Sequence, residues 1–254
     1  MSSPSTALVT GATAGIGLEF ARQLTARGYN LVLVARDPAR LDAVAEELRS
    51  SRTEPDVEVL AADLADRQQL ASVEARLADR DRPVDLLINN AGLGLKRRFL
   101  DNDVEDEQRL LDVLVVAVMR LSHAALRGQA ERGRGGIINV SSVAAFLPRG
   151  TYAAAKAWVN QFGTWAAAEY RPRGVTVTTL CPGFTKTEFH QRMGVRRGTG
   201  FLWMEPDFVV GRALTDFDRG QVLSVPGAQY RAIVTATRLI PSRALQAYQS
   251  IGRR

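Results

Sequence analysis

The stretch TALVTGATAGIG, residues 6–17, joins a short apolar run to three glycines in the spacing G-x-x-x-G-x-G. The apolar run predicts a buried strand, and the apolar residues at helical spacing over 15–27 predict a helix directly after the glycines. In such a turn Gly11 permits a tight bend, Gly15 lets the backbone approach a pyrophosphate, and Gly17 lets helix and strand pack closely. The amides at the helix start then face the phosphates. The alternative is an ordinary strand-to-helix turn, but the elements on both sides favour a dinucleotide site.

The alternation of strand and helix continues along the chain. Apolar, β-branched runs predict strands at residues 6–10, 31–35, 57–61, 84–88, 136–140, 175–180 and 221–225. Amphipathic stretches predict helices at 15–27, 38–48, 67–77, within 104–131, and at 151–169 and 206–215. This order predicts an α/β fold: a single-domain, Rossmann-like, doubly wound parallel sheet of about seven strands with helices on both faces. The domain spans 1–254, with a variable lid at about 188–208 and a helical C-terminal extension at about 228–254.

Composition limits the class of protein. The 254 residues are 46% apolar and 24% charged, which is typical of a globular chain. The single cysteine, Cys181, excludes an internal disulfide and a multi-cysteine zinc site, and we expect no metal. The N-terminus lacks a signal-peptide pattern, and no apolar run approaches the ~18 residues of a membrane-spanning helix, so we expect a cytoplasmic protein.

The net charge of +6 and the pI near 10 raise the question of nucleic-acid binding. The basic residues are three lysines and thirty arginines, and no nucleic-acid recognition motif accompanies them. We therefore expect no nucleic-acid partner. Strong salt-dependent retention on DNA at physiological ionic strength would revive that alternative.

The end of the second predicted strand bears on the choice of cofactor. Sites for NAD(H) commonly hold the ribose 2′-hydroxyl with an acidic residue there. Here Ala35 is followed by Arg36, whose planar guanidinium suits a 2′-phosphate, and Thr13 can add a hydroxyl. Asp37, before Pro38, fits a helix N-cap better than a ribose ligand. The pattern favours NADP(H), with NAD(H) as the alternative.

Tyr152 and Lys156 lie four residues apart near the start of the predicted 151–169 helix, which places them on one helix face. A nearby ammonium lowers the pKa of a phenol, and such a phenol can exchange a proton with a carbonyl or alcohol oxygen. Because this spacing is common in helices by chance, the pair indicates chemistry only together with other motifs.

Six motifs occur in order, each at the carboxyl end of a predicted strand or in the helix that follows, which is where ligands bind an open α/β sheet. They are the turn at 10–17, Asp63-Leu64, Asn89-Asn-Ala-Gly92, Asn139-Val-Ser-Ser142, Tyr152 with Lys156, and Pro182-Gly183 with Thr187. With these motifs the chain resembles the short-chain dehydrogenase/reductase family over nearly its whole length.

The resemblance implies a role for each matching residue. Tyr152 would be the general acid in carbonyl reduction, Ser142 would hydrogen-bond the substrate oxygen, and Lys156 would hold the nicotinamide ribose and tune Tyr152. Asp63 would contact adenine. The full cofactor-binding set is Gly11, Thr13, Gly15, Ile16, Gly17, Arg36, Asp63, Leu64, Asn90, Ala91, Gly92, Tyr152, Lys156, Pro182, Gly183, Thr185 and Thr187.

Two features depart from the family pattern. Leu114 stands where many members have an asparagine that supports a water chain beside the lysine, so either another polar group supports the relay or turnover is slower; we expect activity to survive. The spacing of ten between Ser142 and Tyr152 is also about three residues short, which questions their geometry and keeps Ser141 open as the alternative serine.

The lid and the C-terminal extension are rich in apolar side chains. In the lid, Phe189, Phe201, Leu202, Trp203 and Met204 either line an apolar substrate pocket or pack in the ordinary way. In the extension, Pro241 separates two predicted helices, and apolar stripes that include Tyr230, Ile233 and Val234 lie among arginines. These stripes pack on the same subunit or on a partner, contact a membrane surface or an acidic partner, or close the substrate pocket.

The leading hypothesis is an NADP(H)-dependent oxidoreductase, a short-chain dehydrogenase/reductase. It would transfer a hydride between the nicotinamide and an apolar ketone, 3-oxoacyl compound or secondary alcohol, with Tyr152 as general acid or base. The alternative is a protein that binds the cofactor with impaired catalysis and acts as a binding or regulatory protein. We expect a homodimer or homotetramer formed through the helices at 103–131 and 151–170.

Overall fold

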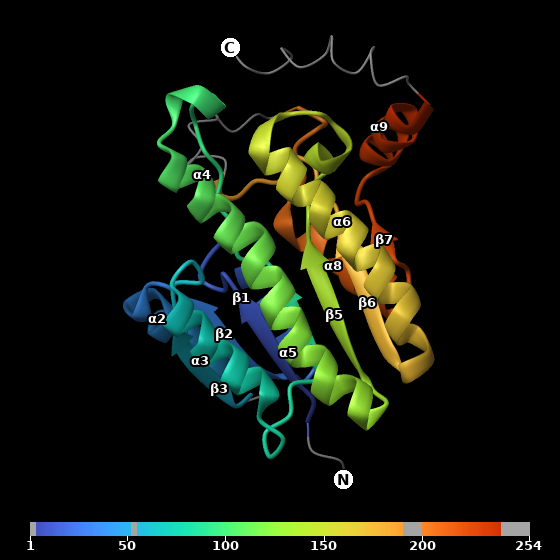
Figure 1. Cartoon of the computed structure of the whole chain (residues 1–254). Helices are drawn as coiled ribbons and strands as arrows, with labels where there is room; N and C mark the ends of the chain where they lie inside the picture. The colour runs from blue at the N-terminus through green and yellow to red at the C-terminus, as the bar shows by residue number, and fades with distance from the viewer. Residues whose placement is uncertain (1–3, 52–54, 190–199, 240–254) are drawn as a thin grey trace.

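Seven parallel strands form one sheet in the computed structural model, which describes residues 4–51, 55–189 and 200–239 (Figure 1). The strands are β1 (Thr6–Thr10), β2 (Asn30–Ala35), β3 (Val57–Ala61), β4 (Leu86–Asn89), β5 (Gly135–Val140), β6 (Val175–Leu180) and β7 (Leu223–Ser224). Their order across the sheet is β3-β2-β1-β4-β5-β6-β7, and every neighbouring pair is parallel. The predicted doubly wound sheet is therefore confirmed.

Helices cover both faces of this sheet. They are α1 (Gly15–Ala26), α2 (Pro38–Arg49), α3 (Arg67–Ala78), α4 (Val104–Leu111), α5 (Ala117–Arg132), α6 (Gly150–Tyr170), α8 (Pro206–Asp218) and α9 (Ala228–Leu239). Alternate residues of one strand enter opposite cores, because successive side chains of a strand point to opposite faces. In β1, Ala7 and Val9 pack with α1, α2 and α8, whereas Leu8 packs with α3, α5 and α6, the three helices in front of the sheet in Figure 1.

Acidic side chains cap two of the first three helices. Asp37 caps α2 by accepting a hydrogen bond from the Arg40 amide at 3.1 Å, with Pro38 in the first turn, so its predicted role as a helix cap is confirmed. Asp66 caps α3 in the same way. The start of α1 differs, because its N-cap residue Ala14 offers no side chain to the free amides.

The long helix predicted within 104–131 is interrupted. Between α4 and α5 lies a π-helical turn, η2 (Asp112–Val116). The helix is therefore continuous, but its backbone hydrogen bonds join residues five apart instead of four in this turn. Helix α5 then ends at Gly133, which has a φ of 66°. Apolar periodicity could not reveal the interruption, because residues on both sides remain amphipathic.

The C-terminal part differs from its predicted limits. The last strand is shorter than predicted and comprises only Leu223–Ser224, while α8 begins inside the predicted lid and continues to Asp218. The extension starts with α9, and its second predicted helix, after Pro241, lies outside the described residues, as do residues 190–199 of the lid. None of the described helices is long and apolar enough to cross a membrane.

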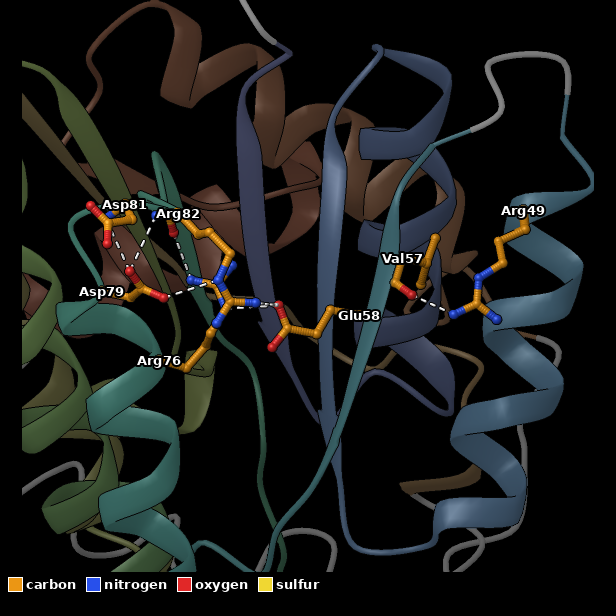
Figure 2. Close-up of polar contacts among 7 residues, drawn as sticks. All are labelled: Arg49, Val57, Glu58, Arg76, Asp79, Asp81 and Arg82. Carbon is orange, nitrogen blue, oxygen red and sulfur yellow. Dashed lines mark hydrogen bonds and ion pairs between the residues drawn. The ribbon is translucent and has the colours of Figure 1, made fainter.

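One buried and two exposed arginines bind groups along the β3 edge of the sheet (Figure 2). Arg76 of α3 is only 8% exposed and donates to the Glu58 carboxylate at 2.8 Å and to the Arg82 carbonyl at 2.7 Å. Arg82 in turn pairs with Asp79 at 3.0 Å, and Arg49 of α2 donates to the carbonyl of β3 residue Val57. Some of the thirty arginines therefore form hydrogen bonds and ion pairs within the chain.

Candidate active site

The site lies where the strand order reverses, at the carboxyl ends of the adjacent strands β1 and β4. The last residue of β1, Thr10, joins the loops that follow the two strands. Its hydroxyl donates to the Ile88 carbonyl at 3.1 Å and accepts from the amides of Asn90 at 2.9 Å and Ala91 at 3.0 Å. The Asn90 side chain donates back to the Thr10 carbonyl at 2.9 Å. The predicted Asn90–Ala91 site therefore lies directly beside the glycine-rich turn.

The glycine-rich turn has the geometry that its spacing predicts. A Cβ on Gly17 would lie 2.2 Å from the Gly11 carbonyl oxygen, so only glycine lets α1 pack this closely. Gly15 has a φ of +55°, and a Cβ there would lie 2.9 Å from Cβ of Thr187. Together with the uncapped start of α1 at Ala14, this cradle fits the pyrophosphate of a dinucleotide.

The adenosine end of the predicted site carries three charged groups. Arg36 is exposed after β2, and Asp63 pairs with Arg109 of α4 at 2.5 Å. Burial would raise the pKa of Asp63, but the hydrogen bonds from Arg109 and the Ala65 amide, with the nearby Arg36 charge, lower it overall. Asp63 is therefore a fixed carboxylate. The side chain of Leu64 is 6% exposed and belongs to the core, which leaves its backbone as the part that can face a cofactor.

Arg40 was not anticipated from the sequence. From α2 it reaches the Thr13 carbonyl at 3.2 Å and the two carboxylate oxygens of Glu188 at 3.0 and 3.3 Å. Glu188 directly follows Thr187, which packs on Gly15. The start of the lid therefore packs on the glycine-rich turn through Thr187, and the ion pair between Glu188 and Arg40 joins it to α2. The available signal was weak: Arg40 lies in the first turn of α2, four residues after Arg36.

Tyr152 and Lys156 lie together on α6, as their spacing predicts. The Lys156 ammonium is 5.8 Å from the centre of the Tyr152 ring and donates to the Val140 carbonyl at 2.7 Å. The expectation that the ammonium lowers the pKa of Tyr152 is wrong for this structure, because burial raises that pKa to about 12, although an interaction with the Ser142 side chain acts in the opposite direction. Burial also lowers the pKa of Lys156 to about 8. At neutral pH the pair is therefore a neutral phenol beside an ammonium.

The two candidate serines have different surroundings. Ser141 is 2% exposed, and its hydroxyl donates to the Lys156 carbonyl at 2.9 Å. Ser142 is partly exposed, its hydroxyl oxygen accepts from the Ala144 amide at 3.1 Å, and its side chain hydrogen-bonds with that of Tyr152. The short loop after β5, with its single turn η3 (Val143–Phe146), thus still brings Ser142 to Tyr152.

Leu114 is fully buried in a small apolar cluster with Leu110, Val113 and Ala155. Tyr152 packs against the same cluster. The residue at the usual asparagine position therefore supports the tyrosine by packing. Among the described residues, Lys156 finds its hydrogen-bond acceptor in the backbone of Val140 instead.

The lid residues that were grouped as pocket candidates separate in the structure. The centre of the Phe189 ring lies 6.1 Å from that of the Tyr152 ring, which places Phe189 beside the Tyr152–Lys156 pair. Trp203 stacks on Phe184 at 5.2 Å, Met204 is 6% exposed in the core, and Phe201 is 80% exposed. Of these four, only Phe189 is placed next to Tyr152. In α9, Tyr230 and Val234 are buried against the same subunit, as one of the alternatives expected, while Ile233 is 42% exposed.

Comparisons with known proteins agree with this arrangement. The family model for short chain dehydrogenases matches residues 5–197. A short-chain dehydrogenase from Sphingobium yanoikuyae, solved in complex with NADPH, is 36% identical with a TM-score of 0.85, covering 97% of this chain and 96% of that one. The bulky-bulky ketone specific alcohol dehydrogenase from Comamonas testosteroni is 32% identical with a TM-score of 0.82, covering 97% and 95%.

Galactitol 2-dehydrogenase (L-tagatose-forming) from Cereibacter sphaeroides is 31% identical over 241 residues, 87% of this chain and 93% of that protein. The family model matches most of the chain, and the parallel sheet with ordered motifs at its carboxyl edge is the fold expected of this family. The chain is an oxidoreductase that belongs to the short-chain dehydrogenase family.

Proposed function

We propose that this protein is an NADP(H)-dependent oxidoreductase that interconverts a bulky apolar ketone and its secondary alcohol. The observation that carries the proposal is the cluster of Ser142, Tyr152 and Lys156 beside the carboxyl end of β5. These groups supply a hydrogen-bond donor, a proton and a cation at one place, which is what reduction of a carbonyl requires.

In this proposal the bound nicotinamide supplies the hydride, and the protein supplies orientation and the proton. The Ser142 hydroxyl, which lies beside Tyr152 and accepts from the Ala144 amide at 3.1 Å, turns its proton toward the carbonyl oxygen of the bound substrate. The Tyr152 hydroxyl gives its proton to that oxygen as negative charge develops there. The Lys156 ammonium stabilises the tyrosinate left behind and offers its remaining N–H donors to the nicotinamide ribose.

The ionisation of the pair supports reduction at neutral pH. A phenol with a pKa raised to about 12 by burial remains protonated and can act as an acid. Lys156, with its pKa lowered to about 8, is still mainly charged at pH 7 and loses its charge in mildly alkaline solution. Reduction should therefore weaken as the pH rises through 8, because the tyrosinate then loses its neighbouring cation.

The preference for NADP(H) rests on cations at the adenosine end. Arg36 is exposed beside the predicted ribose site, and Arg40 contacts the backbone of Thr13 in the glycine-rich turn at 3.2 Å. Guanidinium groups favour a phosphate over a hydroxyl. The Sphingobium yanoikuyae relative, solved with NADPH, supports this choice.

The preference for an apolar substrate rests on the surroundings of Tyr152. Its ring packs against the Leu114 cluster on one side and has Phe189 at 6.1 Å. The Comamonas testosteroni relative that is specific for bulky ketones is consistent with such a site. Linear 3-oxoacyl compounds are the second class to test, because an acyl chain fits the same apolar walls.

A cofactor titration followed by a carbonyl panel tests the proposal. NADPH should bind more tightly than NADH, and bulky ketones should drive NADPH oxidation faster than small polar aldehydes. Tyr152→Phe should lower turnover by at least about a hundredfold, the usual contribution of a positioned general acid, with NADPH affinity nearly unchanged. NADPH binding without oxidation by any member of the panel would instead support the alternative of a binding or regulatory protein.

We also propose a homodimer formed through α6. Trp158, Phe162 and Trp165 follow one another at helical spacing, with ring centres 4.9 and 5.7 Å apart. Trp165 is 50% exposed. Trp158 and Phe162 are partly buried, and a helix face of this kind, with aromatic rings that end in an exposed tryptophan, is suited to self-association about a two-fold axis.

A further inference from the structure

The segment 182–187, which follows β6, lies where the nicotinamide face is expected. Hydrogen bonds connect it to two other segments of the chain. The Pro182 carbonyl accepts from the Val143 amide at 3.0 Å, which ties the turn to the loop of Ser142. The Phe184 carbonyl accepts from the Met204 amide at 2.9 Å, and Met204 in turn accepts from Lys186 at 3.0 Å. The turn thus pairs with the segment that returns from the lid.

Tyr230 of α9 holds these two segments together. Its hydroxyl accepts a hydrogen bond from the Phe184 amide at 2.9 Å and donates to the Leu202 carbonyl at 2.6 Å. The ring covers Gly183 so closely that a Cβ there would lie 2.0 Å from Cζ of Tyr230. Tyr230 is only 3% exposed, so water does not replace these contacts readily.

The contacts of Tyr230 also affect the glycine-rich turn, the proposed site of the cofactor pyrophosphate. Beyond Phe184 the chain continues to Thr187, which packs on Gly15 of the glycine-rich turn. The position of Gly183 and the course of the chain to Thr187 therefore both depend on an anchor in the C-terminal extension. Without the hydroxyl, the Phe184 amide and the Leu202 carbonyl would lose their shared partner, and the turn would be free to shift.

We infer that Tyr230 is a positioning residue for the nicotinamide half of the cofactor. It fixes the conformation of the 182–187 segment through its contacts with Gly183 and Phe184, without itself touching the reacting groups. This inference rests on the proposed function, since it concerns the same cofactor site. It makes the start of the C-terminal extension part of the active-site architecture.

The test compares a whole cofactor with a fragment that lacks the nicotinamide. Dissociation constants for NADPH and for adenosine 2′,5′-bisphosphate are measured on the full chain for the wild type, Tyr230→Phe and Thr178→Val. Thr178 is the matched control, because its fully buried hydroxyl donates to the Gln221 carbonyl at 2.7 Å on another part of the sheet. Hydrogen exchange of peptides covering 183–187 shows whether the turn has loosened.

Tyr230→Phe should weaken NADPH binding about fivefold, the effect of about one net hydrogen bond, while the affinity for the bisphosphate stays within about twofold. Amides of 183–187 should exchange faster, and Thr178→Val should change neither ligand. Equal weakening of both ligands, or unchanged NADPH affinity, would overturn the inference. Failure of the wild type to bind NADPH would overturn the proposed function itself, so the two failures are distinguishable.

Discussion

Lys156→Met should give a protein that is more stable than the wild type at pH 7, with an advantage that shrinks as the pH rises. Lys156 is 4% exposed, and its ammonium donates to the Val140 carbonyl at 2.7 Å. Among the described residues no carboxylate pairs with it. Burial lowers its pKa from 10.5 to about 8, so the folded state carries a charge that it disfavours.

The sign and size follow from that shift. Between pH 8 and 10.5 the unfolded chain binds more protons at Lys156 than the folded protein does, so wild-type stability rises with pH. Two and a half pKa units correspond to about 3 kcal/mol, of which about 1.4 kcal/mol is recovered between pH 7 and pH 9. Methionine leaves the Val140 carbonyl unpaired at a cost of about 1 kcal/mol, so the net gain at pH 7 is about 2 kcal/mol.

Urea unfolding without cofactor at pH 7, 8 and 9 measures this difference between the variant and the wild type. Lys96→Met provides the control, because Lys96 is exposed and its removal should leave the pH dependence unchanged. If the stability of Lys156→Met stayed parallel to that of the wild type across this range, the argument from burial would be wrong.

Three further predictions concern the surroundings of the site. Leu114→Asn buries an amide in an apolar cluster and should cost about 1–3 kcal/mol in urea unfolding, with no rise in turnover; a many-fold gain in turnover would show that the native proton relay is impaired. Glu188→Gln removes the carboxylate that neutralises Arg40 and should tighten NADPH binding severalfold by fluorescence titration while shifting stability by less than about 1 kcal/mol. Unchanged affinity there would show that Arg40 does not face the cofactor phosphate. Trp165→Glu places a charge at the exposed end of the aromatic row of α6 and should halve the mass measured by light scattering, whereas an unaltered mass would exclude this helix as the interface.

The sequence predicted the parts of the fold that depend on local pattern. Continuous apolar runs marked the buried strands, and Asp37 before Pro38 marked a helix start, because both signals come from neighbouring residues. The roles of the site residues at strand ends came instead from the resemblance to the short-chain dehydrogenase/reductase family, and their placement agrees with the rule that the carboxyl ends of parallel strands meet at one edge of the sheet.

Contacts between distant elements were not predictable in this way. Arg109 meets Asp63 across 46 positions, and Tyr230 meets Phe184 across another 46. Nothing in the local sequence of either residue indicates these partners, because an arginine or tyrosine on an amphipathic helix is compatible with many positions. The packing of the sheet and helices decides which of them is used.

The π turn η2 between α4 and α5 determines the direction in which the side chains of α4 point. Each residue of an α-helix rotates the side-chain direction by about 100°, so deleting one residue within Asp112–Val116 would restore a regular helix and turn α4 about its own axis. Because α5 is fixed by its packing against α3, the rotation would fall on α4 and carry Arg109 away from Asp63. A single-residue deletion in this turn would in this way separate Arg109 from Asp63, and it would also disturb Leu114, which packs in the same cluster as Tyr152.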